Sequence, residues 1–180
     1  MQTQVKWTVE DYHRMIAAGI LENRKVELLA GEICQMPSEG PPHSYFGGNL
    51  ADQFRSRLGN RALVRNANPI TLSNSEPEPD IAVVRGTWDT YRYRHPNAED
   101  VFLIVEVSET SLQKDLTLKR AVYAAAGIED YWILDLKGNQ LIVLRDPQEG
   151  EYRSEERLQQ GEISPLPFAD LTFSVSQLLA

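Results

Sequence analysis

The sequence is poor in cysteine and contains no long apolar run, and each shortage excludes a class of protein. Its one cysteine, Cys34, cannot form an internal disulfide, and no cysteine–histidine cluster has the spacing of a zinc site. No stretch approaches the ~20 apolar residues of a membrane-spanning helix. Residues 1–7 lack the apolar core of a signal peptide. We therefore expect a soluble protein with no membrane partner, located in the reducing cytoplasm.

Positive charge is also scarce. The chain has 18 Lys and Arg against 26 Asp and Glu, a formal net charge of -8, whereas phosphate attraction supplies most nonspecific affinity for nucleic acid. The cations are unevenly spread, because residues 53–75 contain no acid and residues 91–95 alternate aromatic with basic side chains. These two stretches are either solvated surface or a nucleic-acid contact. The candidate contacts are Arg55, Arg65, Arg92 and Arg94.

The 180 residues suit one domain, and the order of expected elements indicates an α/β fold. Hydrophobic periodicity and capping residues predict helices over 8–19, 43–58, 111–126 and 175–179. Extended segments are expected over 26–33 (a hairpin), 62–72, 80–84, 101–108, 130–136 and 140–144, with an edge strand near Tyr152. The strand–helix–strand order around 101–136 predicts helices packed on a mixed sheet.

The segment 101–108 is apolar on both faces, as in a central strand of a sheet that is covered on both sides. Alternation places four side chains on one face: Phe102, Ile104, Glu106 and Ser108. A carboxylate buried there needs a partner, because an unpaired buried charge is very costly. Glu106 is therefore either a site residue near the carboxyl end of the strand or a strand-end residue that reaches solvent.

Two further charged residues stand in unusual positions. Asp80 follows Pro79 at the start of an apolar strand, as a fixed oxygen ligand or as an ordinary turn aspartate. Lys119 falls in the middle of the apolar stripe of the 111–126 helix, whereas Lys114 points to the opposite, solvated side. A lysine on the core-facing stripe must extend outward or meet a carboxylate. The alternative for Lys119 is an i,i+4 pair with Asp115.

These residues suit metal-assisted phosphodiester hydrolysis. The carboxylates of Asp80 and Glu106 are hard ligands of the kind that Mg²⁺ prefers, and Mn²⁺ can substitute for it. The metal would polarise a phosphoryl oxygen and activate water, while Lys119 orients or deprotonates that water and screens developing charge. The sequence thus predicts Asp80, Glu106 and Lys119 as catalytic residues, with the first two as metal ligands.

Several segments resemble a known family. They are Pro79-Asp80, Glu106-Val107-Ser108, Asp115-x3-Lys119-x3-Tyr123 and the run from Gly127 to Asp135. Over roughly residues 7–175 the chain resembles the putative restriction endonuclease family of the PD-(D/E)XK nuclease superfamily. The resemblance implies a restriction-endonuclease-like mixed sheet flanked by helices. It also implies that the motif lysine, replaced at its usual place by Ser108, has moved to Lys119.

The same resemblance implies a shared pocket and an activity. The resemblance places Glu27 and His43 in a pocket beside the catalytic residues, and Ser108, Asp115 and Tyr123 are further possible pocket residues. The expected function is a metal-dependent endonuclease, acting on DNA as a homodimer, since cutting both strands generally requires two active sites. The main alternative, favoured by the net acidity, is a catalytically silent nuclease-fold protein that binds nucleic acid or a protein partner. A non-nuclease hydrolase with paired carboxylates would leave Lys119 unexplained.

Overall fold

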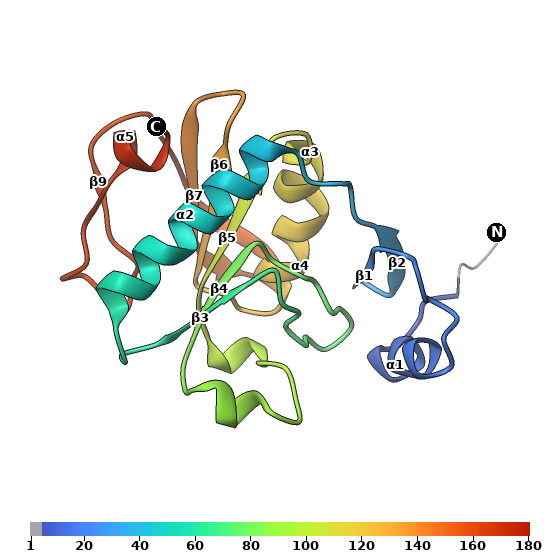
Figure 1. Cartoon of the computed structure of the whole chain (residues 1–180). Coiled ribbons are helices and arrows are strands. Elements are labelled where there is room, and N and C mark those ends of the chain that lie inside the picture. Colours follow the sequence, from blue (N-terminus) through green and yellow to red (C-terminus); the bar gives the residue numbers. More distant parts are fainter. Residues whose placement is uncertain (1–4) are drawn as a thin grey trace.

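A six-stranded mixed sheet forms the centre of the protein in the computed structural model, which describes residues 5–180 (Figure 1). Neighbouring strands are antiparallel except for the parallel pair β5–β6. In spatial order the strands are β3 (Leu63–Asn66), β4 (Ile81–Val84), β5 (Val101–Ser108), β6 (Asp130–Asp135), β7 (Gln140–Gln148) and β8 (Glu151–Leu158). The predicted central strand and the edge strand near Tyr152 are both confirmed.

Helices cover both faces of the sheet, which is why β5 is apolar on both sides. On one face α2 (Pro41–Leu58) and α5 (Val175–Leu178) pack with the C-terminal segment, which pairs β9 (Glu162–Ile163) with β10 (Phe173–Ser174). The other face carries the helical crossover from β5 to β6: α3 (Leu112–Lys114), a π-helical turn (Asp115–Lys119) and α4 (Arg120–Ala125). The predicted mixed sheet flanked by helices is therefore confirmed.

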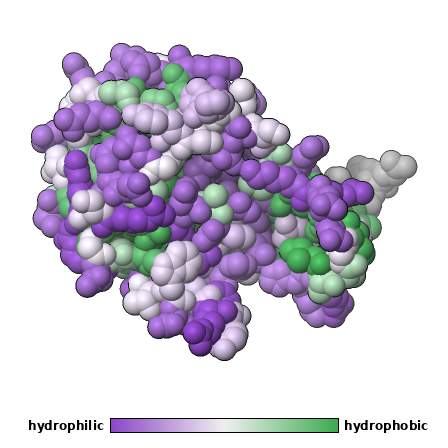
Figure 2. All heavy atoms as spheres, viewed as in Figure 1, coloured by the Kyte–Doolittle hydropathy of each residue, from purple (hydrophilic) through white to green (hydrophobic). Residues whose placement is uncertain are grey.

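The N-terminal part forms a lobe beside the sheet, made of α1 (Val9–Ala17) and the hairpin β1 (Val26–Leu29) and β2 (Glu32–Gln35) (Figure 1). A capping box between Thr8 and Asp11 starts α1, and a bridge between Leu28 and Glu76 ties the hairpin to the body. Figure 2 shows apolar surface on this lobe. Its exposed apolar side chains include Val5, Trp7, Ile16 and Ile20.

The structure differs from the sequence expectations in a few places. Helix α2 begins at Pro41, because prolines are well tolerated in the first helical turn. Only Leu63–Asn66 of the expected extended segment 62–72 forms a strand, and β7 continues to Gln148. Phe102 does not share the face of Glu106: a register shift opposite Val84 turns its ring onto the α2 side, against Phe168.

Two expectations concern membranes and targeting. None of the helices within residues 5–180 combines the length and apolar character needed to cross a bilayer. The signal-peptide expectation rests on residues 1–7, of which 1–4 lie outside the described residues.

Candidate active site

The sheet register brings the two predicted metal ligands together. Ile81 of β4 pairs with Val105 of β5, so one step further along the antiparallel ladder Asp80 lies beside Glu106 and Val107. The backbone N–H of Val107 donates to Asp80 Oδ2 at 2.6 Å. Asp80 thus sits where β4 begins and Glu106 near the end of β5, on neighbouring strands.

Glu106 is buried and held by two donors from the crossover helix. Lys119 Nζ and the Tyr123 hydroxyl both donate to Glu106 Oε1, each at 2.7 Å. Glu106 and Lys119 are only 2% and 5% exposed. Glu106 therefore does not reach solvent at the strand end, and Lys119 does not extend outward into water. The Asp115–Lys119 pair considered as an alternative is not formed, because the Lys119 ammonium meets Glu106 instead.

The π-helical turn corrects the expectation for Lys114. In a regular α-helix, residues five apart point about 140° away from each other. Here the Arg120 N–H bonds to the Asp115 carbonyl, five residues back, and this wider turn brings Lys114 and Lys119 to the same side. Lys114 Nζ donates to Glu27 Oε1, and its side chain is only 23% exposed, whereas a solvated side chain was expected.

Glu27 lies inside the site rather than on a hairpin surface. It is 1% exposed, and it accepts from Lys114 through Oε1 and from the backbone N–H of Glu78 through Oε2. Lys119 Nζ lies 3.8 Å from the same Oε2. Glu27 therefore bridges the two lysines and connects the N-terminal hairpin with the crossover helix.

His43, in the first turn of α2, contacts the other predicted metal ligand. Its Nε2 lies 3.2 Å from Asp80 Oδ2. Its buried Nδ1 has no hydrogen-bond partner among residues 5–180, and Glu39 Oε2 is 3.6 Å away. The hydrogen bond to Asp80 raises the pKa of His43 against the opposing effect of burial. A charged imidazole there donates to Asp80 and fixes the carboxylate.

Ser108 and Asp115 form a supporting pair. Ser108 Oγ and Ser111 Oγ each donate to Asp115 Oδ2 at 2.6 Å, and Ser108 is fully buried. Burial raises the pKa of Asp115, while Lys119 and the two serines oppose that shift. Ser108, at the position that the superfamily motif gives to lysine, thus anchors the start of the crossover helix.

An excess of acid defines the pocket between these residues. Its walls include two lysines and one histidine against six carboxyl groups, those of Glu27, Glu39, Glu78, Asp80, Glu106 and Asp115. Burial raises the pKa of Glu106 well above its ordinary value, against the effect of Lys119. Burial opposes the charge of Lys119, but Glu106, Glu27 and other carboxylates outweigh it and raise the lysine pKa. Lys119 is therefore a cation in this site.

A divalent cation fits this donor set. Lys119 and Tyr123 both donate to Oε1 of Glu106, and the Val107 N–H and His43 both bond to Oδ2 of Asp80. The other oxygen of each carboxylate therefore has no hydrogen bond within residues 5–180. The cavity of about 40 Å³ is large enough for an ion with one or two waters. The described residues hold no cluster of three or more candidate metal-binding side chains, so waters or a substrate phosphate would complete the shell, as is usual for Mg²⁺.

The four candidate nucleic-acid arginines are not equivalent. Arg65 is 4% exposed and packs against Trp88 and Tyr91, so in this structure it cannot reach a ligand strand as expected. The other three are exposed. Arg55 pairs with Asp52, Arg94 pairs with Asp100, and Arg92 has no ion pair within the described part of the chain. Arg65 is buried because β3 directs its side chain inward, against the loop that follows β4.

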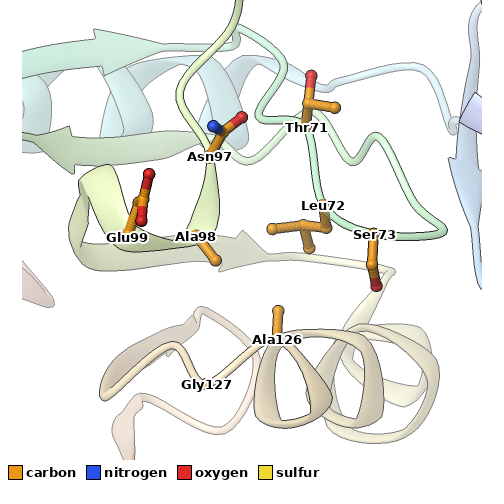
Figure 3. Close-up of a pocket in the computed structure, with 8 residues that line it drawn as sticks. All are labelled: Thr71, Leu72, Ser73, Asn97, Ala98, Glu99, Ala126 and Gly127. Carbon is orange, nitrogen blue, oxygen red and sulfur yellow. The ribbon is translucent and has the colours of Figure 1, made fainter.

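Sequence reasoning missed several polar pocket residues: Glu39, Glu78, Ser111 and Lys114. The pKa of Glu78 is raised, first by burial, and its place in Glu76-Pro77-Glu78-Pro79 was the available signal. For Lys114 no such signal exists, because a helical wheel assumes regular turns. A larger cavity of about 570 Å³ lies elsewhere, with Leu72 on one wall and Ala126 on the other (Figure 3); Glu99 is its only charged lining residue.

The mixed sheet, the crossover helix and the acid–lysine cluster together define a nuclease-like protein. The fold is similar to that of a crystal structure described as a putative nuclease belonging to DUF820 from Anabaena variabilis ATCC 29413. That similarity has a TM-score of 0.66 and 18% sequence identity, and it covers 86% of this chain and 89% of the other. A family model, Uma2, described as putative restriction endonuclease, matches residues 9–176. The chain therefore belongs to the Uma2 family; no curated protein matches it significantly.

We predict that Lys119→Met destabilises the protein in a pH-dependent way when a chelator keeps metal away. Without its cation, Glu106 has to be protonated in the folded state, so its pKa rises further above the unfolded value of about 4.3. A carboxyl whose folded pKa is raised loses stability as the pH rises above that unfolded value. The loss relative to wild type should be small near pH 5 and about 3–5 kcal/mol at pH 8.

Urea denaturation from pH 5 to pH 8 measures this loss. The matched control is Lys137→Met, because Lys137 is exposed, and its loss should stay near zero at every pH. A Lys119→Met loss that does not change with pH would contradict the ion pair.

Proposed function

We propose that this protein is a metal-dependent endonuclease that hydrolyses phosphodiester bonds of DNA. The observation that carries the proposal is the buried Lys119–Glu106 bond beside Asp80, because a buried lysine and two carboxylates on neighbouring strands serve no evident packing purpose. Family membership supports the reaction class. Mg²⁺ or Mn²⁺, held by Asp80 and Glu106, would polarise the phosphoryl group and activate water.

The chain's own residues divide the remaining work. Tyr123 and Lys119 fix the orientation of Glu106, and His43 and the Val107 N–H fix that of Asp80. Since the pKa of Lys119 is raised, its ammonium acts as a charge that orients water and stabilises the phosphorane-like transition state, not as a base. Glu27 keeps both lysines at the pocket.

We predict that Lys119→Met lowers the turnover of cleavage by about 10²–10³, the usual loss when one transition-state donor is removed. Lys114→Met should cause a smaller loss, because Lys114 contacts Glu27 and not Glu106. Nicking of plasmid DNA and cutting of single-stranded, duplex and RNA substrates, with Mg²⁺, Mn²⁺ or chelator, measure both effects. Lys137→Met is the control and should cut like wild type.

Two results would count against the assignment. Wild-type rates in Lys119→Met would remove Lys119 from the catalytic residues. An inactive wild type on every substrate and metal would favour the alternative of a silent nuclease-fold protein that binds nucleic acid or a protein partner.

We predict that Mn²⁺ binds at Asp80 and Glu106. Asp80→Asn and Glu106→Gln keep the size of each side chain but remove the charge, so each should weaken binding at least tenfold in isothermal titration. Asp52→Asn is a suitable control, because Asp52 is an exposed carboxylate on α2. Equal Mn²⁺ affinity in wild type and Asp80→Asn would rule out this site.

We predict a homodimer, because cutting both strands of a duplex generally takes two sites and this chain holds one. The exposed apolar side chains of the N-terminal lobe, including Ile16 and Ile20, are a candidate contact surface. Light scattering at micromolar concentration should give twice the chain mass of 20.4 kDa. A mass of one chain would contradict the dimer, and Ile20→Glu should produce that mass if the lobe forms the contact.

A further inference from the structure

A third cavity, of about 450 Å³, has a lining of opposite character to that of the acid pocket. It lies between α1 and the segment that follows the 3-10 turn η1 (Trp88–Tyr91). No carboxyl group is among its lining residues, although the chain carries a net charge of -8. The side chains around it include His13, Tyr91, Arg92, Tyr93, Arg94 and His95.

Two acids next to the cavity are bonded to residues that line it. Glu76 accepts from Thr71 and is bonded to His13, and Asp100 pairs with Arg94. Arg92 is exposed and forms no ion pair within residues 5–180, so its charge is available to a ligand.

Arg65 adds a buried positive charge behind the cavity. Its guanidinium packs on the rings of Trp88 and Tyr91, and no carboxylate within the described chain pairs with it. Its Nη2 lies 3.5 Å from His95 Nδ1. Because a guanidinium can only donate, Nδ1 accepts and the ring proton is on Nε2. Burial lowers the pKa of His95, and Arg65 adds to that effect, so the ring is a neutral donor.

Tyr93 supplies the feature that selects the ligand. Its side chain is 91% exposed at the rim of the cavity, although an aromatic ring gains by being covered. A nucleobase can stack on an uncovered aromatic ring while its phosphate binds to neighbouring cations. A base inside a duplex has both faces covered by its neighbours and must leave the stack before it can bind in this way.

We propose that this cavity binds an unpaired nucleotide of the substrate strand, with its base on Tyr93 and its phosphate at Arg92. The cavity volume is within the range of about 300–1,000 Å³ that is usual for small-ligand sites. The inference rests on the proposed function only in taking nucleic acid as the substrate. It narrows that substrate to strands with unpaired bases near the cut.

The chain between the two sites supports a single bound strand. Glu76 borders the cavity through His13 and Thr71, Glu78 bonds to Glu27 through its N–H, and Asp80 is in the acid pocket. The four residue steps from Glu76 to Asp80 span at most about 14 Å. Glu76 and Asp80 are therefore separated by no more than about four nucleotides at a rise of about 3.4 Å per nucleotide.

Fluorescence anisotropy with labelled dT12 and a labelled 12-base-pair duplex, in chelator so that nothing is cut, tests the proposal. Wild type should bind dT12 at least tenfold more tightly than the duplex. Tyr93→Ala should weaken dT12 binding about tenfold, whereas Tyr93→Phe, which keeps the ring, should stay within about twofold. Arg92→Ala should lower the slope of log K against log salt by about 0.7, the value for one phosphate contact on a single strand.

The control for charge is Arg153→Ala, an exposed arginine on β8, which should leave affinity and slope unchanged. The proposal is overturned if Tyr93→Ala binds dT12 like wild type, if the duplex binds as tightly as dT12, or if neither binds. Cleavage of the same oligonucleotides with Mn²⁺ separates the two ideas. Tyr93-dependent binding without any cutting would retain this site and reject the nuclease, and cutting that Tyr93→Ala leaves unchanged would do the reverse.

Discussion

The surrounding structure depends on the buried bond between Lys119 and Glu106. Removing two charges from water costs several kcal/mol per ion, and only good geometry with further hydrogen bonds offsets that cost. Here Tyr123 shares the same carboxylate oxygen, and Glu27 lies within 3.8 Å of the ammonium. The pair therefore requires a central strand, a crossover helix packed directly on it and a hairpin that closes over the lysine.

The π-helical turn has a clear consequence at this point. It lets one helix direct two lysines five residues apart, Lys114 and Lys119, toward one pocket, which a regular α-helix does not allow. Such turns are rare and occur frequently at functional sites. Asp115 accepts hydrogen bonds from Ser108 and Ser111, which hold the start of the turn in place.

Charge is separated along the molecule in a way that its net value conceals. The acid pocket concentrates carboxyl groups that a cation can neutralise, while the cavity beside Tyr93 has cations and aromatic rings and no carboxyl lining. The segment from Glu76 to Asp80 connects the two, because Glu76 is bonded to His13 of the cavity and Asp80 lies in the acid pocket. A polyanionic strand would be repelled by the first site without metal and attracted by the second, so metal binding and strand binding would be coupled in such an enzyme.

Much of this architecture follows from the sequence alone. The apolar run 101–108 identified the central strand, and the helical stripe with Lys119 identified the residue that meets Glu106, because both depend on local periodicity in regular elements. Gly127, at φ +74°, ended the crossover helix as its lack of a side chain indicates. Motif resemblance placed Glu27 and His43 at the pocket, which periodicity could not do.

Other features were decided only by tertiary structure. Lys114 faces the pocket because a π-turn changes the rotation of the helix, and Phe102 changes faces because the β4–β5 register shifts. Arg65 is buried because a later segment, with Trp88 and Tyr91, folds over it. In each case the residue's own neighbours in sequence are compatible with either outcome. The outcome was decided by packing between segments that are distant in the chain. The free energy of that packing cannot be read from the local sequence pattern.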